Sequence, residues 1–216
     1  METKILKGTT TVGVTFKGGV VIAADKRASA GTFIASKRAK KVHNITDKIV
    51  FTISGLVADA QVLVKWIRTQ LKLQTLSTGR EPLVSEVANL TATVLHSNFR
   101  TLLPFLVHFI IGGVDKKGPH IYFLDHAGGR NEEKYIATGS GSPIALGILE
   151  DGYREDLTEE EAIILALRAL RGAISRDAAT GDGIDLAIVT EKGTKYLTPK
   201  EIEEKLKGIQ KVFLEG

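Results

Sequence analysis

The order of strand-like and helix-like segments is the feature that most restricts the fold of this 216-residue chain. Segments rich in β-branched residues predict strands, and segments with apolar residues at helical spacing predict helices. They follow one another as strands, two helices, strands, two helices, strands and a final helix. This order lacks a strict strand–helix–strand repeat, so it argues against a doubly wound parallel sheet. It favours a single α+β domain in which two largely antiparallel sheets stack together, with helices outside.

Turn signals and capping residues set the expected boundaries. An N-terminal antiparallel sheet is expected from strands at 9–16, 20–24, 41–45 and 48–53. Later strands are expected at 105–114, 120–124, 135–138, 184–189 and 194–197. Helices are expected at 56–73, 84–103, 143–151 and 158–176. Two capping boxes, Thr158 with Glu161 and Thr198 with Glu201, open the fourth helix and a terminal helix.

Composition removes several classes of function. The chain has no cysteine, which excludes disulfides, thiolate nucleophiles and cysteine-based zinc sites. Its net charge of +4 is too small to suggest nucleic acid, and the basic run at 37–41 is typical of a solvated edge. No apolar run approaches membrane-spanning length, and Ile5-Leu6 is too short for a signal peptide. We therefore expect no nucleic-acid or membrane partner and a cytoplasmic location.

Common catalytic motifs give little support. None of the five histidines is spaced as a metal-binding pair on one helix turn, so no metal or cofactor is expected. The run 139–142 has glycines and serines at the wrong spacing for a nucleophile elbow, and it lacks the lysine of a phosphate-binding loop. A Ser-His-Asp triad assembled in space remains an open alternative.

The junction Gly8-Thr9 offers a different nucleophile. A threonine at a chain's N-terminus carries a nucleophilic hydroxyl and a base, its own α-amine, on one residue. Taken alone, a threonine-rich strand is more often simple β-propensity. Asp25 follows an apolar strand, where a carboxylate needs a partner, and Lys41 opens another strand. A nearby ammonium would lower the proton affinity of the threonine's groups, and the Gly55 N–H before a helix could stabilise an oxyanion.

Several short stretches, in this order and spacing, resemble the β subunit of the archaeal-type 20S proteasome, a self-processing N-terminal-nucleophile hydrolase. The resemblance covers nearly the whole chain. The matching stretches lie at 8–12, 19–25, 27–31, 40–42, 54–55, 139–142 and 176–183. The fold that the resemblance implies is a four-layer αββα sandwich, in agreement with the order of strands and helices.

The resemblance implies a role for each site residue. Residues 1–8 would be a propeptide and 9–216 the catalytic domain, with Thr9 attacking the Gly8 carbonyl and its freed amine then acting as base. Glycine at the cleavage site would permit a tight turn there. The remaining roles are tuning of Thr9 by Lys41, support of Lys41 by Asp25, oxyanion binding by Gly55, and orientation of amine and water by Ser140, Asp177 and Thr180, where the family often has serine.

The resemblance also implies a substrate and partners. Family positions that line the first specificity pocket fall on Ala28, Ala39, Ile53 and Val57, which are small or apolar and predict cleavage after hydrophobic residues. The family forms seven-membered β rings, here of one or more β types, stacked between α-subunit rings. Unfolded chains delivered by an ATPase would be hydrolysed inside the enclosed chamber.

Three alternatives remain at this stage. The chain could be a catalytically silent ring subunit that stays unprocessed, although Thr9, Asp25 and Lys41 are all present. It could be the bacterial ATP-dependent relative, whose chain is shorter. It could also be a non-enzymatic binding module that uses the basic stretch at 38–41, in which case replacing Lys41 would affect no self-cleavage.

Overall fold

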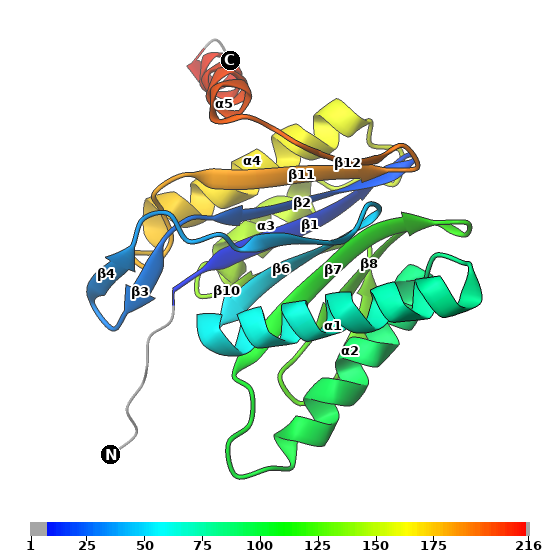
Figure 1. The fold of residues 1–216 in the computed structure, drawn as a ribbon. Helices are drawn as coiled ribbons and strands as arrows, with labels where there is room; N and C mark the ends of the chain where they lie inside the picture. The colour runs from blue at the N-terminus through cyan, green and yellow to red at the C-terminus, as the bar shows by residue number, and fades with distance from the viewer. Residues whose placement is uncertain (1–7, 215–216) are drawn as a thin grey trace.

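Two five-stranded antiparallel sheets lie against each other in this protein (Figure 1). The structure is a computed structural model and describes residues 8–214, so most of the expected propeptide, residues 1–7, lies outside the described residues. The first sheet has the order β10 (Tyr135–Gly139), β1 (Thr10–Phe16), β2 (Gly19–Asp25), β11 (Ile184–Thr190) and β12 (Gly193–Tyr196). The second has the order β5 (Val42–Thr46), β6 (Ile49–Gly55), β7 (Val107–Asp115), β8 (Gly118–Leu124) and β9 (Arg130–Glu133).

Helices cover the outer face of each sheet. The first sheet packs on α3 (Ser142–Gly152) and α4 (Glu159–Arg176), and α5 (Pro199–Leu214) lies against α4. The second sheet packs on α1 (Val57–Thr78) and α2 (Val84–Phe99). Figure 1 shows α1 and α2 on one side of the two sheets and α4 on the opposite side. The four-layer αββα sandwich expected from the sequence is therefore confirmed.

Alternation along β2 shows how the layers are held together. Val21 and Ala23 face the α3–α4 layer, whereas Val20 and Ile22 face the second sheet, and all four are fully buried. Each buried valine or isoleucine contributes about 1.5–3 kcal/mol relative to an exposed one. Close contact between the sheets depends on a glycine, because a Cβ at Gly112 would lie 2.4 Å from Ile22 Cδ1.

The prediction that the four N-terminal strands form one sheet was wrong. The four strands exist, but β1 and β2 belong to the first sheet and β5 and β6 to the second. Between the two pairs lies a hairpin that the sequence did not predict, β3 (Ala28–Ala30) and β4 (Phe33–Ser36), which forms a separate two-stranded sheet. These strands are short and none of their residues is buried, so they carry no buried-face alternation to signal them.

Other boundaries shifted for local reasons. The edge strand β9 was missed because all four of its residues are polar, as suits an exposed sheet edge. Helix α1 runs beyond the expected end at residue 73 to Thr78, where Gly79 adopts a left-handed conformation that closes it. Both predicted capping boxes are confirmed by their hydrogen bonds. No helix among residues 8–214 is long and apolar enough to cross a membrane.

Candidate active site

Thr9 lies directly before β1 and is 5% exposed. Its hydroxyl donates a hydrogen bond to the carbonyl oxygen of Gly8, with 2.6 Å between the oxygens. A nucleophile in this position lies beside the carbonyl group that it would attack. Glycine at position 8 has a steric reason: a Cβ there would lie 1.8 Å from the Ala179 Cβ.

Asp25 is the fully buried centre of the hydrogen-bond network at the end of β2. Its Oδ1 accepts from Lys41 Nζ at 2.6 Å and from the Thr10 N–H at 3.0 Å. Its Oδ2 accepts from the N–H groups of Arg27 at 3.1 Å and Gly181 at 2.9 Å. The shared Oδ1 brings the Lys41 ammonium next to the backbone that follows Thr9.

Lys41 is buried with its carboxylate partner. Its side chain is 6% exposed and that of Asp25 is 0% exposed. Burial disfavours the charged ammonium and lowers the pKa of Lys41, and this loss of solvation outweighs the opposing attraction of Asp25. A lysine with a lowered pKa in a cavity is a common feature of functional sites.

Two hydroxyl groups donate directly to Asp177 behind Thr9, and a third reaches it through Thr180. Ser140 Oγ and Thr180 Oγ1 each donate to Asp177 Oδ2 at 2.5 Å. Ser140 Oγ in turn accepts from the Thr9 N–H at 3.3 Å. Because Thr180 donates its only hydroxyl proton to Asp177, Thr10 must donate to Thr180 across their 2.7 Å contact. The network therefore runs from both sides of the Thr9–Thr10 peptide bond to one carboxylate.

This network keeps Asp177 ionised. Partial burial alone would raise the pKa of Asp177, but the hydrogen bonds from Ser140, Thr180 and the Ala179 N–H together lower it below its ordinary value. The carboxylate therefore accepts hydrogen bonds from its neighbours across the neutral pH range. Gly139 and Gly141, which flank Ser140, allow this close approach: a Cβ on Gly139 would lie 2.0 Å from the Thr9 carbonyl oxygen.

Gly55 is the last residue of β6. It lies one residue further from the first residue of α1 than the sequence predicted, because Leu56 is the N-cap of that helix. Its φ is +116°, a conformation that L side chains rarely adopt. A Cβ there would lie 2.1 Å from the Leu106 carbonyl oxygen. Two independent constraints thus require glycine where the sequence predicts an oxyanion-binding N–H.

One cavity of about 650 Å³ joins these parts. Gly8, Thr9, Lys41 and Gly55 all line it. The four residues predicted for the specificity pocket line the same cavity: Ala28, Ala39, Ile53 and Val57. The structure thus brings every predicted site residue into the cavity or into the network directly behind it.

The sequence analysis assigned no role to Arg27 and Ser29, whose partners are distant in the sequence. Arg27 binds Asp182 at 2.7 Å and the Ala178 carbonyl oxygen at 2.7 Å, which ties the 177–182 loop to the end of β2. Ser29 accepts a hydrogen bond from the Gly8 N–H at 2.8 Å. No local pattern could have revealed these pairs, because 155 residues separate Arg27 from Asp182 and 21 separate Gly8 from Ser29.

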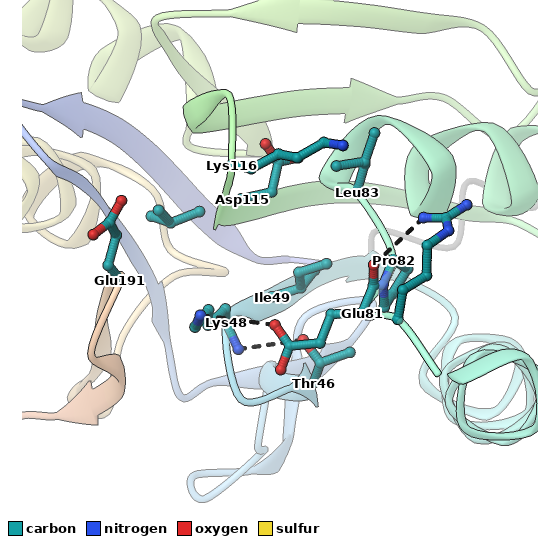
Figure 2. A pocket seen from close by; sticks show the side chains of 11 residues that line it. Thr46, Lys48, Ile49, Glu81, Pro82, Leu83, Asp115, Lys116 and Glu191 are labelled. Atoms are coloured by element: carbon teal, nitrogen blue, oxygen red, sulfur yellow. Dashed lines mark hydrogen bonds and ion pairs between the residues drawn. The ribbon is translucent and has the colours of Figure 1, made fainter. Parts of the chain in front are cut away.

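A second cavity of about 490 Å³ lies at the other end of β6 and α1, and Figure 2 shows its charged side chains. Lys48 pairs with Glu81, and Arg80 pairs with Glu86. These ion pairs are exposed, and the cavity contains none of the predicted catalytic residues. Within residues 8–214, no cluster of three or more histidine or acidic side chains could hold a metal ion.

Comparison with known proteins gives one consistent family. The family described as "Proteasome subunit" matches residues 5–189. "Proteasome subunit beta" of Ferroglobus placidus is 51% identical over 93% of this chain and 95% of its own. "Proteasome subunit beta 1" of Korarchaeum cryptofilum is 48% identical over 93% and 96%, and "Proteasome subunit beta" of Archaeoglobus fulgidus is 45% identical over 98% and 99%. The chain therefore belongs to the proteasome subunit family and is similar to archaeal β subunits over most of its length.

Proposed function

We propose that this chain is a threonine-type endopeptidase subunit of a 20S proteasome core that frees its own nucleophile by cleaving the Gly8–Thr9 bond. The observation that carries the proposal is the Thr9 hydroxyl at 2.6 Å from the Gly8 carbonyl oxygen, beside a buried Lys41–Asp25 pair. A solely structural subunit would have no need to bury an ammonium ion next to a threonine, because an ion pair costs desolvation on both partners.

Self-cleavage would convert the Gly8–Thr9 amide into an ester. Thr9 Oγ attacks the Gly8 carbonyl carbon, its proton passes to the Thr9 nitrogen, and the C–N bond breaks. This leaves Gly8 esterified to Thr9 Oγ and a free Thr9 α-amine. Water then hydrolyses the ester, which releases residues 1–8 with a new carboxylate and restores the hydroxyl. The Ser140 hydroxyl, at 3.3 Å from the Thr9 nitrogen, is placed to support the nitrogen as it becomes an amine.

Substrate hydrolysis would repeat this chemistry between two chains. The Thr9 amine takes the hydroxyl proton, through a water molecule, as Oγ attacks a substrate carbonyl. The Lys41 ammonium lowers the proton affinity of the nucleophile, and the Gly55 N–H stabilises the oxyanion. Ser140, Asp177 and Thr180 orient the amine. The apolar cavity wall formed by Ile53 and Val57 favours a hydrophobic residue before the cleaved bond.

The outer surface supports assembly into rings. Large exposed apolar residues concentrate on α1, α2 and their loops, where Val62 is 62%, Leu76 74% and Leu102 100% exposed. In the described part of the α3–α4 layer no large apolar side chain is exposed. Apolar patches of this kind mark protein interfaces. The exposed residues support a protein interface of this kind, and we propose that the chain assembles into a heptameric β ring between α-subunit rings, in the cytoplasm, with unfolded chains supplied by an ATPase.

Hydrolysis of a short reporter peptide by the assembled particle tests the function. Wild type should cleave the peptide, Thr9→Ala should be inactive, and Thr9→Ser, which keeps a hydroxyl, should retain activity. A silent ring subunit predicts no difference among the three proteins. Hydrolysis that survives in assembled Thr9→Ala particles would contradict the proposal, because it would require another nucleophile.

A further inference from the structure

We propose that the Ser29 hydroxyl is a positioning residue for self-cleavage: it accepts the Gly8 N–H and thereby aims the Gly8 carbonyl at the Thr9 hydroxyl. This inference rests on the proposed self-processing at Gly8–Thr9. It adds a residue to which the resemblance gave no role and which lies on the hairpin that the sequence analysis did not predict.

Two hydrogen bonds hold Gly8 from both sides of its Cα. The N–H of Gly8 donates to Ser29 Oγ at 2.8 Å, and the carbonyl oxygen of Gly8 accepts from Thr9 Oγ1 at 2.6 Å. Together they fix both peptide groups that flank the residue. An attacking hydroxyl and a carbonyl that are held in one geometry react much faster than partners that must find each other.

Gly8 needs this support because it must be glycine. A Cβ at this position would lie 1.8 Å from the Ala179 Cβ and 2.4 Å from the Ala179 carbonyl oxygen. Glycine, however, has the largest backbone freedom of any residue and the greatest conformational entropy to lose. Ala179 therefore requires glycine at position 8, although glycine is the residue whose backbone is least restricted. The hydrogen bond from the Gly8 N–H to Ser29 restricts that backbone.

An irregularity in the β3–β4 pairing and the anchored residue Arg27 set the position of Ser29. The pairing of β3 with β4 shifts its register between Ala28 and Ser29, and an irregularity of this kind re-aims a side chain. The residue before the hairpin is anchored, since the Arg27 N–H donates to Asp25 and its guanidinium binds Asp182. Within residues 8–214 the bond to Gly8 is the one hydrogen bond of the Ser29 hydroxyl, so this group stabilises no other part of the described structure.

The rate of self-cleavage tests this role. Full-length chains would be synthesised in a timed cell-free reaction with partner subunits, and the fraction lacking residues 1–8 followed by intact-mass measurement. Ser29→Ala should process about tenfold more slowly, the equivalent of losing one hydrogen bond in the transition state. Ser29→Thr keeps the acceptor and should stay within about threefold of wild type. Ser97→Ala, which removes an exposed hydroxyl on α2, should match wild type.

Each result is decisive. In Ser29→Ala, the rate of reporter-peptide hydrolysis per processed subunit should fall less than the rate of self-cleavage. The reason is that a processed subunit has lost Gly8, so Ser29 no longer has this residue to position. Equal processing of wild type and Ser29→Ala would overturn the positioning role alone. A slow Ser29→Ala that Ser29→Thr does not rescue, or that unfolds at a lower temperature, would assign the effect to structure and also overturn it. A wild type that is never processed would overturn the proposed function itself.

Discussion

Each of the two cavities at opposite ends of β6 and α1 is lined by a lysine that pairs with a carboxylate, but the surroundings of the two pairs are very different. At the first cavity, Lys41 lies 2.6 Å from Asp25, which is behind the cavity wall, and their side chains are 6% and 0% exposed. In the second, Lys48 and Glu81 lie 3.7 Å apart with side chains 36% and 68% exposed. Loss of solvation therefore dominates at the first pair, whereas water screens the second.

The pKa values of the basic residues Lys41 and Arg80, one beside each cavity, change in opposite directions. Burial lowers the pKa of Lys41 despite its partner. Beside the second cavity, the hydrogen bond to Glu86 raises the pKa of Arg80, and the same bond together with the Leu83 N–H lowers the pKa of Glu86 to about 2. Glu86 there closes the first turn of α2, which is a structural role. The comparison teaches that desolvation, more than the presence of an ion pair, distinguishes the reactive end of this molecule.

The largest effect is expected from removing one member of the buried pair. Lys41→Met leaves the Asp25 carboxylate buried without its counter-ion, which should cost roughly 3–5 kcal/mol of stability. It should also reduce peptide hydrolysis by about 10²–10⁴-fold, because the nucleophile loses its neighbouring positive charge. Urea unfolding and reporter-peptide hydrolysis measure the two effects. An active and fully stable Lys41→Met would remove the distinction between the cavities.

Alanine substitutions at Gly55 and Gly118 separate two costs: the strain of a positive φ, which both positions share, and the clash of a Cβ with a neighbouring atom, which only Gly55 has. Gly55 and Gly118 share a φ of +116°, so alanine at either position should cost about 1–2 kcal/mol. Nothing lies within 4 Å of a Cβ at Gly118, whereas one at Gly55 meets the Leu106 carbonyl oxygen at 2.1 Å. Gly55→Ala should therefore unfold at lower urea concentration than Gly118→Ala and lose hydrolysis. Equal losses in both variants would mean that the contact with Leu106 is unimportant.

The pH dependence of stability gives a smaller effect with a defined sign. The pKa of Lys41 is lowered in the folded state, so between that value and about 10.5 the unfolded chain binds more protons than the folded one. Stability contributed by this group should therefore rise with pH through that window. Lys41→Met should lack this rise, whereas the Lys48→Met control should keep it. If the free energy of unfolding depended on pH in the same way for wild type and Lys41→Met between pH 8 and 10.5, this result would contradict the lowered pKa of Lys41.

The smallest effect is expected in the second cavity. Lys48→Ala breaks an exposed pair and should change stability by only about 0.2–1 kcal/mol, with self-cleavage and hydrolysis unchanged. The same unfolding and hydrolysis measurements apply. A loss comparable to that of Lys41→Met would show that the second cavity carries a function of its own.

The sequence predicted layers more reliably than pairings. Apolar periodicity and the capping boxes at Thr158 and Thr198 located the helices, because these signals are local. Periodicity cannot say which strands pair, so β1 and β5 were wrongly joined in one sheet. Strands without a buried face, such as β3 and β9, give no signal at all.

The candidate site was predictable where residue identity itself carries the chemistry. Thr9, Asp25 and Lys41 are recognisable by type, by position relative to strands and by resemblance. The contacts of Ser29 and Arg27 depend on the path of the hairpin and of the 177–182 loop, which bring distant segments together. The steric reason for Gly8 was likewise hidden, because it depends on Ala179.

The intact mass of the subunit in assembled particles tests the central claim most directly. Wild type should have lost residues 1–8 and begin at Thr9, while Thr9→Ala should retain residues 1–8. A wild-type subunit that keeps residues 1–8 in assembled particles would contradict self-processing at Gly8–Thr9. Shortening of Thr9→Ala at the same bond would contradict Thr9 as the nucleophile.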